Sequence, residues 1–141
     1  SNNGFKTYRG NEKGRIFDSK ANKFFRGVRL LDSYLNLSGD NFSELSYKSK
    51  LINVPSSRFL RPAQNNFLEK LKLKRIIKAM SRAAQNNQGF HLWWHPHNFG
   101  NNLNLSINSL IKILDHFKIL NEKYGMVSST MYEASKLSSN D

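Results

Sequence analysis

Three of the four histidines and both tryptophans of this chain lie in one short segment, Gly89–Gly100. His91, His95 and His97 are spaced so that all three would share one face of a regular strand. Histidines at this spacing suit a zinc or iron site when a carboxylate or a third histidine completes the ligand set. The alternative for His91 is a side chain packed in the strand and hydrogen-bonded to backbone or water, and the pattern favours it.

The position of His95 gives it access to chemistry. Phe90–Trp94 is apolar and aromatic and follows a glycine, which predicts a short buried strand. Pro96 has no N–H for a sheet ladder, so we expect the strand to end just before it. His95 would then lie at the strand's carboxyl end, with His97 and Asn98 on the loop beyond, where α/β folds collect ligands. An imidazole there can serve as an acid or base near neutral pH.

Aromatic and basic side chains near this segment are candidates for ligand binding. Trp93 and Trp94 would point to opposite sides of the strand, so that one packs in the core and Trp94 can stack on a sugar ring or a base. Arg58 and Arg61, just before Pro62, could clamp a carboxylate or phosphate. The alternative is that both arginines are surface side chains on a loop.

The first half of the chain carries weaker signals. Phe5–Arg9 alternates apolar and polar residues and predicts a strand, which places Arg9 at a strand exit before a Gly-Asn turn. Phe24–Leu37 is expected to be a helix with Val28, Leu31 and Leu35 on its buried face. Residues 12–23 and 40–57 are predicted to be loops, apart from a short strand at Leu51–Val54.

The second half of the chain carries clearer helix signals. Asn66 and Glu69 predict the start of a helix that ends near Asn86. Its expected apolar stripe is Phe67, Leu71, Ile76, Ile77, Met80 and Ala84, with the lysines of this helix mostly turned away. A second helix is expected over Asn104–Tyr124, ended by Gly125, with a stripe made of Ile107, Leu110, Leu114, Phe117 and Tyr124.

The C-terminal residues predict two more elements. Val127–Ser129 is expected to be a short strand, and Thr130 with Glu133 has the spacing of a capping box that opens a last helix. Helices alternating with strands indicate an α/β fold. His116, in the middle of a predicted helix, carries no motif and is expected to be a helix-flank residue.

Composition limits the functional classes. The 141 residues fit one small domain, and no run approaches the roughly 18 apolar residues of a membrane span. The absence of cysteine excludes thiolate metal sites. The net charge of +12 suits acidic partners, such as nucleic acid, a membrane surface or an anionic polysaccharide, but it is spread along the chain and is typical of a solvated surface.

The segment Phe90–Gly100, with the sequence FHLWWHPHNFG, resembles the last signature of bacterial polysaccharide deacetylases, related to carbohydrate esterase family four. The resemblance implies a β/α barrel in which His95 is the general acid, with His97 and Asn98 lining the same mouth. Thr7–Gly10 is similar to the family's arginine-bearing strand exit, which implies that Arg9 steadies the catalytic aspartate. Asn11 stands where the family has a proline.

Further along, Asp32 resembles the acidic residue that tunes the histidine. The family's paired aspartates and its helix-spaced histidine ligands have no match here, because no adjacent aspartates occur and the one His-x-x-x-His is His91 with His95. The resemblance therefore implies that residues 1–141 are a single partial domain, the C-terminal half of the catalytic domain. The divalent metal, zinc, would be bound by ligands outside this chain, in the missing N-terminal half.

The expected function is metal-dependent removal of N- or O-acetyl groups from a polysaccharide, in a bacterial cytoplasm or cell envelope, with the chain alone inactive. No nucleic acid and no membrane span are expected. Two other classes stay open. One is a carbohydrate-binding or assembly module without catalysis. The other is a basic module that binds single-stranded nucleic acid through lysines and a stacked tryptophan.

Overall fold

The computed structural model describes residues 4, 6–10, 23–35, 39, 42–43, 45–48 and 51–137 of the chain. Its elements, in order, are β1 (Thr7–Tyr8), α2 (Lys23–Leu35), β2 (Ser46–Lys48), β3 (Leu51–Asn53), β4 (Arg58–Phe59), α3 (Phe67–Gln85), β5 (Leu92–Trp93), the 3₁₀ helix η1 (Pro96–Asn102), α4 (Leu103–Tyr124) and α5 (Met131–Leu137). The fold is mixed α/β, as predicted. The loop expected over residues 12–23 lies outside the described residues, except Lys23, which begins α2.

Residues 51–60 form the extended segment on which the small sheets are built. β3 pairs in parallel with β1 and antiparallel with β2, and β4 pairs in parallel with β5. Backbone hydrogen bonds occur along the whole segment. At its start the Ile52 N–H donates to the Lys6 carbonyl (2.9 Å), and at its end the Leu60 N–H donates to the Trp93 carbonyl (2.8 Å). Because β1 and β5 both run parallel to this segment, the chain leaves both strands at the same edge. Sequence analysis predicted neither β2 nor β4.

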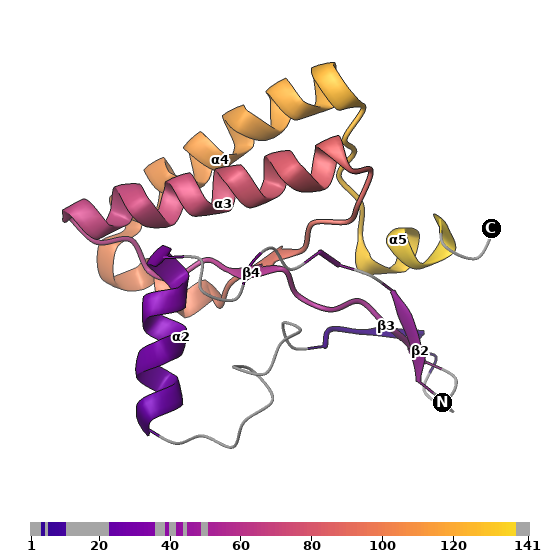
Figure 1. The fold of residues 1–141 in the computed structure, drawn as a ribbon, viewed down its shortest axis with the longest axis horizontal. Coiled ribbons are helices and arrows are strands. Elements are labelled where there is room, and N and C mark those ends of the chain that lie inside the picture. The colour runs from indigo at the N-terminus through magenta and orange to yellow at the C-terminus, as the bar shows by residue number, and fades with distance from the viewer. Residues whose placement is uncertain are drawn as a thin grey trace.

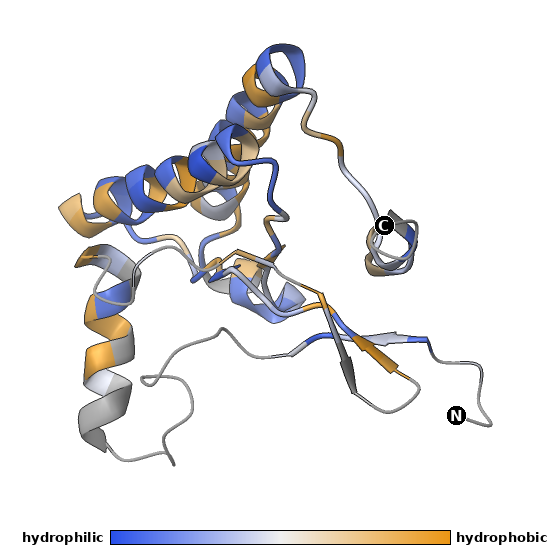
Figure 2. Cartoon of the chain, turned by 45° about the vertical axis from the view of Figure 1, so that its right-hand side comes forward, coloured by the Kyte–Doolittle hydropathy of each residue, from blue (hydrophilic) through white to orange (hydrophobic). Residues whose placement is uncertain are grey.

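The apolar core lies between α3 and α4, which run side by side above the strands (Figure 1). Its buried members are Leu60, Leu73, Ile76, Met80, Ile113 and Leu120. Figure 2 shows hydrophobic and hydrophilic colour alternating along the ribbons of both helices, as expected of amphipathic helices. Among the helices that the structure describes, none has the length and apolar character needed to cross a bilayer.

The helix ends follow local sequence signals. The Asn66 side chain accepts a hydrogen bond from the Glu69 N–H (3.2 Å), which confirms the predicted start of α3. Gly125 ends α4 in the left-handed region, at φ 68°, where a side chain would be strained. Thr130 and Glu133 bond reciprocally before α5, so the predicted capping box is confirmed. These hydrogen bonds hold the pKa of Glu133 below its ordinary value.

The predicted buried faces were partly wrong. On α2, Leu31 and Leu35 are 52 % and 59 % exposed, and Asp32 is buried instead. On α4 the buried residues are Ser106, Ser109, Ile113 and Leu120, whereas Ile107, Leu114 and Tyr124 of the predicted stripe are exposed. On α3, Phe67 is 70 % exposed. The stripes were placed by apolar residue type alone, but small polar residues fit where α3 and α4 approach closely.

The segment predicted as a final strand is also different. Residues 127–129 form no strand, and Val127 is 66 % exposed. Val-Ser-Ser has a β-branched residue but no long apolar pattern, so local propensity was a weak guide.

Candidate functional site

The site begins where β5 ends. Phe59 and Trp93 face each other in the parallel register of β4 and β5, and their rings are 4.4 Å apart. The strand stops before Pro96, as predicted, and η1 follows, with the Asn98 N–H donating to the His95 carbonyl (2.9 Å). His95 therefore lies two residues beyond the end of β5, between the strand and η1, and its side chain is exposed.

Four ring systems and a guanidinium make up the site. The imidazole of His95 stands edge-on to Trp93, with centroids 5.0 Å apart and planes at 85°, and its other face stacks on His97 at 5.1 Å. The guanidinium carbon of Arg9 lies 3.5 Å from the Trp93 ring centroid. Arg9 and His95 are therefore both held by one indole, although they are far apart in the sequence.

Arg9 reaches this position from the exit of β1. A Cβ at the next residue, Gly10, would collide with the side chain of Asn53, so glycine allows the close approach of β1 and β3. The Arg9 side chain is exposed, and among the residues that the structure describes no carboxylate pairs with it. The guanidinium can therefore offer its in-plane N–H groups to an anion.

Donors predominate in this segment. Within the described part of the chain, the buried Trp93 Nε1 and Asn98 Nδ2 atoms have no hydrogen-bond partner. Both are N–H groups, and leaving a buried donor unpaired costs about 1–3 kcal/mol. Unpaired buried donors are uncommon in folded proteins, so these two are candidates for a functional role.

The second tryptophan has different neighbours. Trp94 is 38 % exposed, and its ring lies 5.9 Å from that of Phe99 in η1. Trp93 instead contacts Phe59, Arg9 and His95. The two rings therefore differ in surroundings, as expected for adjacent residues of a strand, and Trp94 offers an exposed aromatic surface for a sugar ring.

His91 is a packed residue of the strand segment. Its Nδ1 atom is 3.3 Å from the Val54 carbonyl, and its backbone N–H donates to the Ser57 hydroxyl (3.0 Å). Burial lowers the pKa of His91, against the opposing effect of hydrogen bonds to backbone carbonyls. The packed alternative for His91 is therefore confirmed.

The three histidines do not form a metal site of their own. Ring nitrogen lone pairs lie in the ring plane, and the stacked rings of His95 and His97, with planes at 17°, do not direct them to one point. In the part of the chain that the structure describes, no group of three His, Asp or Glu side chains could hold a metal ion. Binding of the implied zinc by ligands outside this chain stays a prediction.

Two predicted binding residues lie deeper than expected. Arg58 is only 4 % exposed, and its guanidinium donates to the carbonyls of Ser57 and Gly39. The alternative of a surface arginine is wrong for Arg58, because β4 turns its side chain inward. Arg61 is half-buried, with its guanidinium carbon 5.7 Å from the Phe59 centroid. Arg61 therefore lies beside the aromatic cluster, whereas Arg58 braces the backbone beneath it.

Asp32 is held between two helices. Its carboxylate on α2 forms an ion pair with Arg75 on α3 at 2.9 Å, and both side chains are buried. Arg75 had no predicted role, because a basic residue on a lysine-rich helix carries no signal of its partner. The tuning of His95 by Asp32 stays a prediction.

Other polar contacts between elements were also missed. The His116 Nε2 atom lies 2.7 Å from the Ser81 hydroxyl, so His116 joins α4 to α3 and is more than a helix-flank residue. Lys72, expected to face away, is buried beside Glu69 at 2.7 Å, and burial lowers the pKa of its ammonium group. The carboxylate of Glu69 also accepts from Ser109 on α4. Glu69 and Lys72 have the three-residue spacing of neighbours on a helix, but no sequence pattern identifies the partners that lie on α4.

Comparison with protein-family models, with curated proteins and with solved structures gives no match to this chain. The geometry that the site residues supply is an exposed imidazole and a guanidinium on one indole ring, at the carboxyl ends of parallel strands.

Proposed function

We propose that this chain is the C-terminal part of the β/α-barrel catalytic domain of a polysaccharide deacetylase, and that His95 is its general acid. The observation that carries the proposal is the position of His95, which is exposed two residues after the end of β5 and lies edge-on to Trp93. The sequence around it resembles the family signature in which this histidine closes a strand. Arg9, which the second family-like motif would place near the catalytic aspartate, lies at the exit of β1 on the same indole.

The step assigned to His95 is proton donation. An amine is a poor leaving group unless its nitrogen is protonated as the C–N bond breaks, and a protonated imidazole within reach supplies that proton. With an O-acetyl substrate the proton goes to the departing oxygen instead. Trp93 supports this step by fixing the imidazole plane, and exposure of His95 allows a glycan to approach.

The remaining catalytic groups would come from outside this chain. They include the divalent metal's ligands and the aspartate base, which Arg9 would steady. The tuning of His95 by Asp32 stays a prediction outside this proposal, because the Asp32 carboxylate pairs with Arg75. The chain's own contribution is the proton donor and part of the glycan-binding surface, made by Trp94, His97, Asn98 and Arg61.

The test is deacetylation of an acetylated polysaccharide by the protein that unites this chain with the metal-binding half. His95→Ala is expected to lower turnover by at least about a hundredfold, the lower bound for general-acid catalysis. His116→Ala removes a histidine of the same chain from the α3–α4 contact and is expected to leave turnover near that of the parent. Unchanged turnover in His95→Ala would end the assignment.

A second candidate, glycan binding without catalysis, is favoured by the exposed ring of Trp94. The two tryptophans are the only ones in the chain, so their fluorescence reports directly on this site. Glycan binding by the chain that is lost in Trp94→Ala and kept in His95→Ala, together with a lack of deacetylation by the united protein, would favour this candidate.

A further inference from the structure

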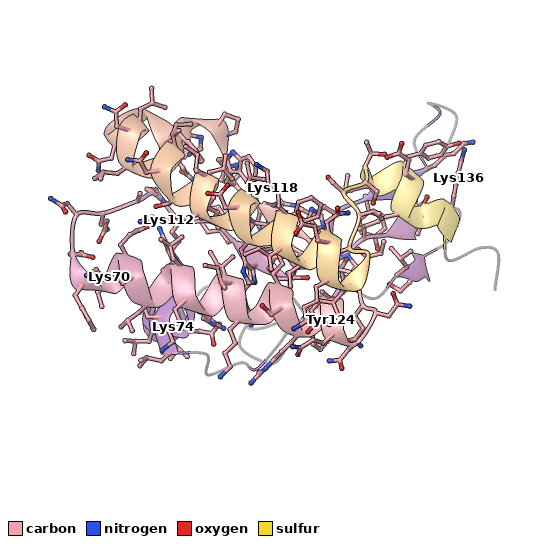
Figure 3. All side chains as sticks on the ribbon, turned by 90° about the horizontal axis from the view of Figure 1, so that it is seen from above. Lys70, Lys74, Lys112, Lys118, Tyr124 and Lys136 are labelled. Carbon is pink, nitrogen blue, oxygen red and sulfur yellow. The ribbon has the colours of Figure 1, made fainter. Side chains whose placement is uncertain are left out.

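The outer face of α3 carries a row of lysines. Lys70, Lys74 and Lys78 are exposed and four residues apart, so they lie on one side of the helix at axial steps of about 6 Å. Figure 3 shows Lys70 and Lys74 along this helix, well away from Lys136 on α5. Like charges at this spacing weaken a helix by about 0.2–0.5 kcal/mol per pair.

Among the residues that the structure describes, no carboxylate compensates this row. Glu69 is the one acidic residue of α3, and it pairs with the buried Lys72. In the described part of the chain, no ion pair involves Lys70, Lys74 or Lys78. The row is therefore available to an anionic partner.

Apolar side chains are exposed next to the lysines. Phe67, three residues before Lys70 and on the same side of α3, is 70 % exposed, and Leu68 is 41 % exposed. On the neighbouring helix α2, Leu31 and Leu35 are exposed, and the ion pair of Asp32 with Arg75 holds α2 against α3. Figure 2 shows apolar colour both at the start of α3 and on the end of α2 that meets it. We call these residues, with the lysine row, the α2–α3 surface.

The combination of charges and apolar groups selects among partners. A second copy of this chain would bring a second lysine row against the first, at a net charge of +12 for each chain. A nucleic acid would neutralise the lysines but leave the leucines in water. A bilayer with anionic headgroups satisfies both, because lysine ammonium groups bind headgroups while Phe and Leu enter the interface.

We infer that the α2–α3 surface binds the interface of an anionic lipid bilayer, with Phe67 inserted and Lys70, Lys74 and Lys78 on headgroups. The proposal is independent of the deacetylase assignment, because it involves a different surface. Binding of this kind weakens with salt over the range in which the Debye length falls below about 10 Å.

The test uses the whole chain and sedimentation with vesicles of phosphatidylcholine, alone or with about 30 mol % phosphatidylglycerol. Binding is expected with the anionic vesicles and not with the neutral ones. Changing Lys70, Lys74 and Lys78 together to Gln should weaken it about a hundredfold, at about fivefold per lysine. The matched control changes Lys6, Lys123 and Lys136 to Gln, which removes the same charge elsewhere and should weaken it much less.

Phe67→Ala separates the bilayer from other polyanions. It is expected to weaken vesicle binding roughly tenfold, the effect of withdrawing a phenyl group from an apolar phase. Val127→Ala, at a similarly exposed position, should change it little. Circular dichroism would verify that each variant is folded.

Three results would overturn the proposal. One is the absence of binding to anionic vesicles. Another is an equal loss of vesicle binding in the two triple Lys→Gln variants. The third is unchanged vesicle binding in Phe67→Ala together with tighter binding to a single-stranded oligonucleotide, which would identify the surface as a nucleic-acid site.

Discussion

At the scale of single residues, burial determines which histidine can carry a proton to a ligand and which is structural. His95 is exposed at a strand exit, whereas His91, four residues earlier, is half-buried and bonded to backbone. A buried imidazole favours its neutral form, because desolvation penalises the charge. The two histidines therefore fit different roles, a proton donor and a structural residue.

The lowered pKa of His91 predicts a pH dependence of stability. Its ordinary pKa is 6.5, and the folded chain holds it lower, so below about pH 6.5 the unfolded chain binds more protons. The free energy of unfolding is then expected to fall as the pH is lowered through 6.5 and on to the folded-state pKa. Urea unfolding at a series of pH values measures this.

The control for that experiment is a pair of histidine variants. His91→Gln should flatten the pH dependence in the window below 6.5, whereas His97→Gln, which keeps His91 in place, should preserve it. An unchanged slope in His91→Gln would show that other groups cause the dependence.

At the scale of elements, polar contacts join the helices as much as apolar ones do. Asp32 and Arg75 connect α2 to α3, and Ser81 with His116 and Glu69 with Ser109 connect α3 to α4. The apolar cluster fills the space between these contacts. Helix placement here thus depends on pairs that are distant in sequence.

Breaking the Asp32–Arg75 pair is expected to be costly. Asp32→Asn leaves the Arg75 guanidinium buried beside a neutral partner, and loss of one member of a buried ion pair costs about 3–5 kcal/mol. Denaturant unfolding monitored by circular dichroism measures the change. The double variant Asp32→Leu/Arg75→Met removes both charges and should recover much of the lost stability. An Asp32→Asn protein as stable as the parent would contradict the buried ion pair.

At the scale of the whole molecule, charge is the dominant property. The chain has 22 basic and 10 acidic residues, so the folded state concentrates a net positive charge. Self-repulsion of that kind destabilises a compact state and is screened by salt.

Stability is therefore expected to increase with ionic strength. Raising sodium chloride from about 0.02 to about 0.2 M should raise the thermal midpoint, because the Debye length falls to about 7–8 Å over that range. The Lys70, Lys74 and Lys78 triple Gln variant should show a smaller rise, since part of the repulsion is already removed. A midpoint that falls with salt would show that attractive ion pairs outweigh the repulsion.

The amino-acid sequence by itself determined the features that depend on neighbours along the chain. The first residues of α3 and α5 follow from Asn66 and from Thr130 with Glu133, because N-terminal capping bonds join residues three apart. The end of β5 follows from Pro96, which cannot donate to a ladder. The place of His95 at a strand exit was predictable for the same reason.

Tertiary structure alone decided what depends on distant partners. Arg58 and Lys72 are buried, Asp32 pairs with Arg75, and Arg9 rests on Trp93. Each of these joins segments whose approach is set by strand pairing and helix packing, and no local pattern records it. A charged residue type predicts exposure on average, and only the fold supplies the partner that makes burial possible.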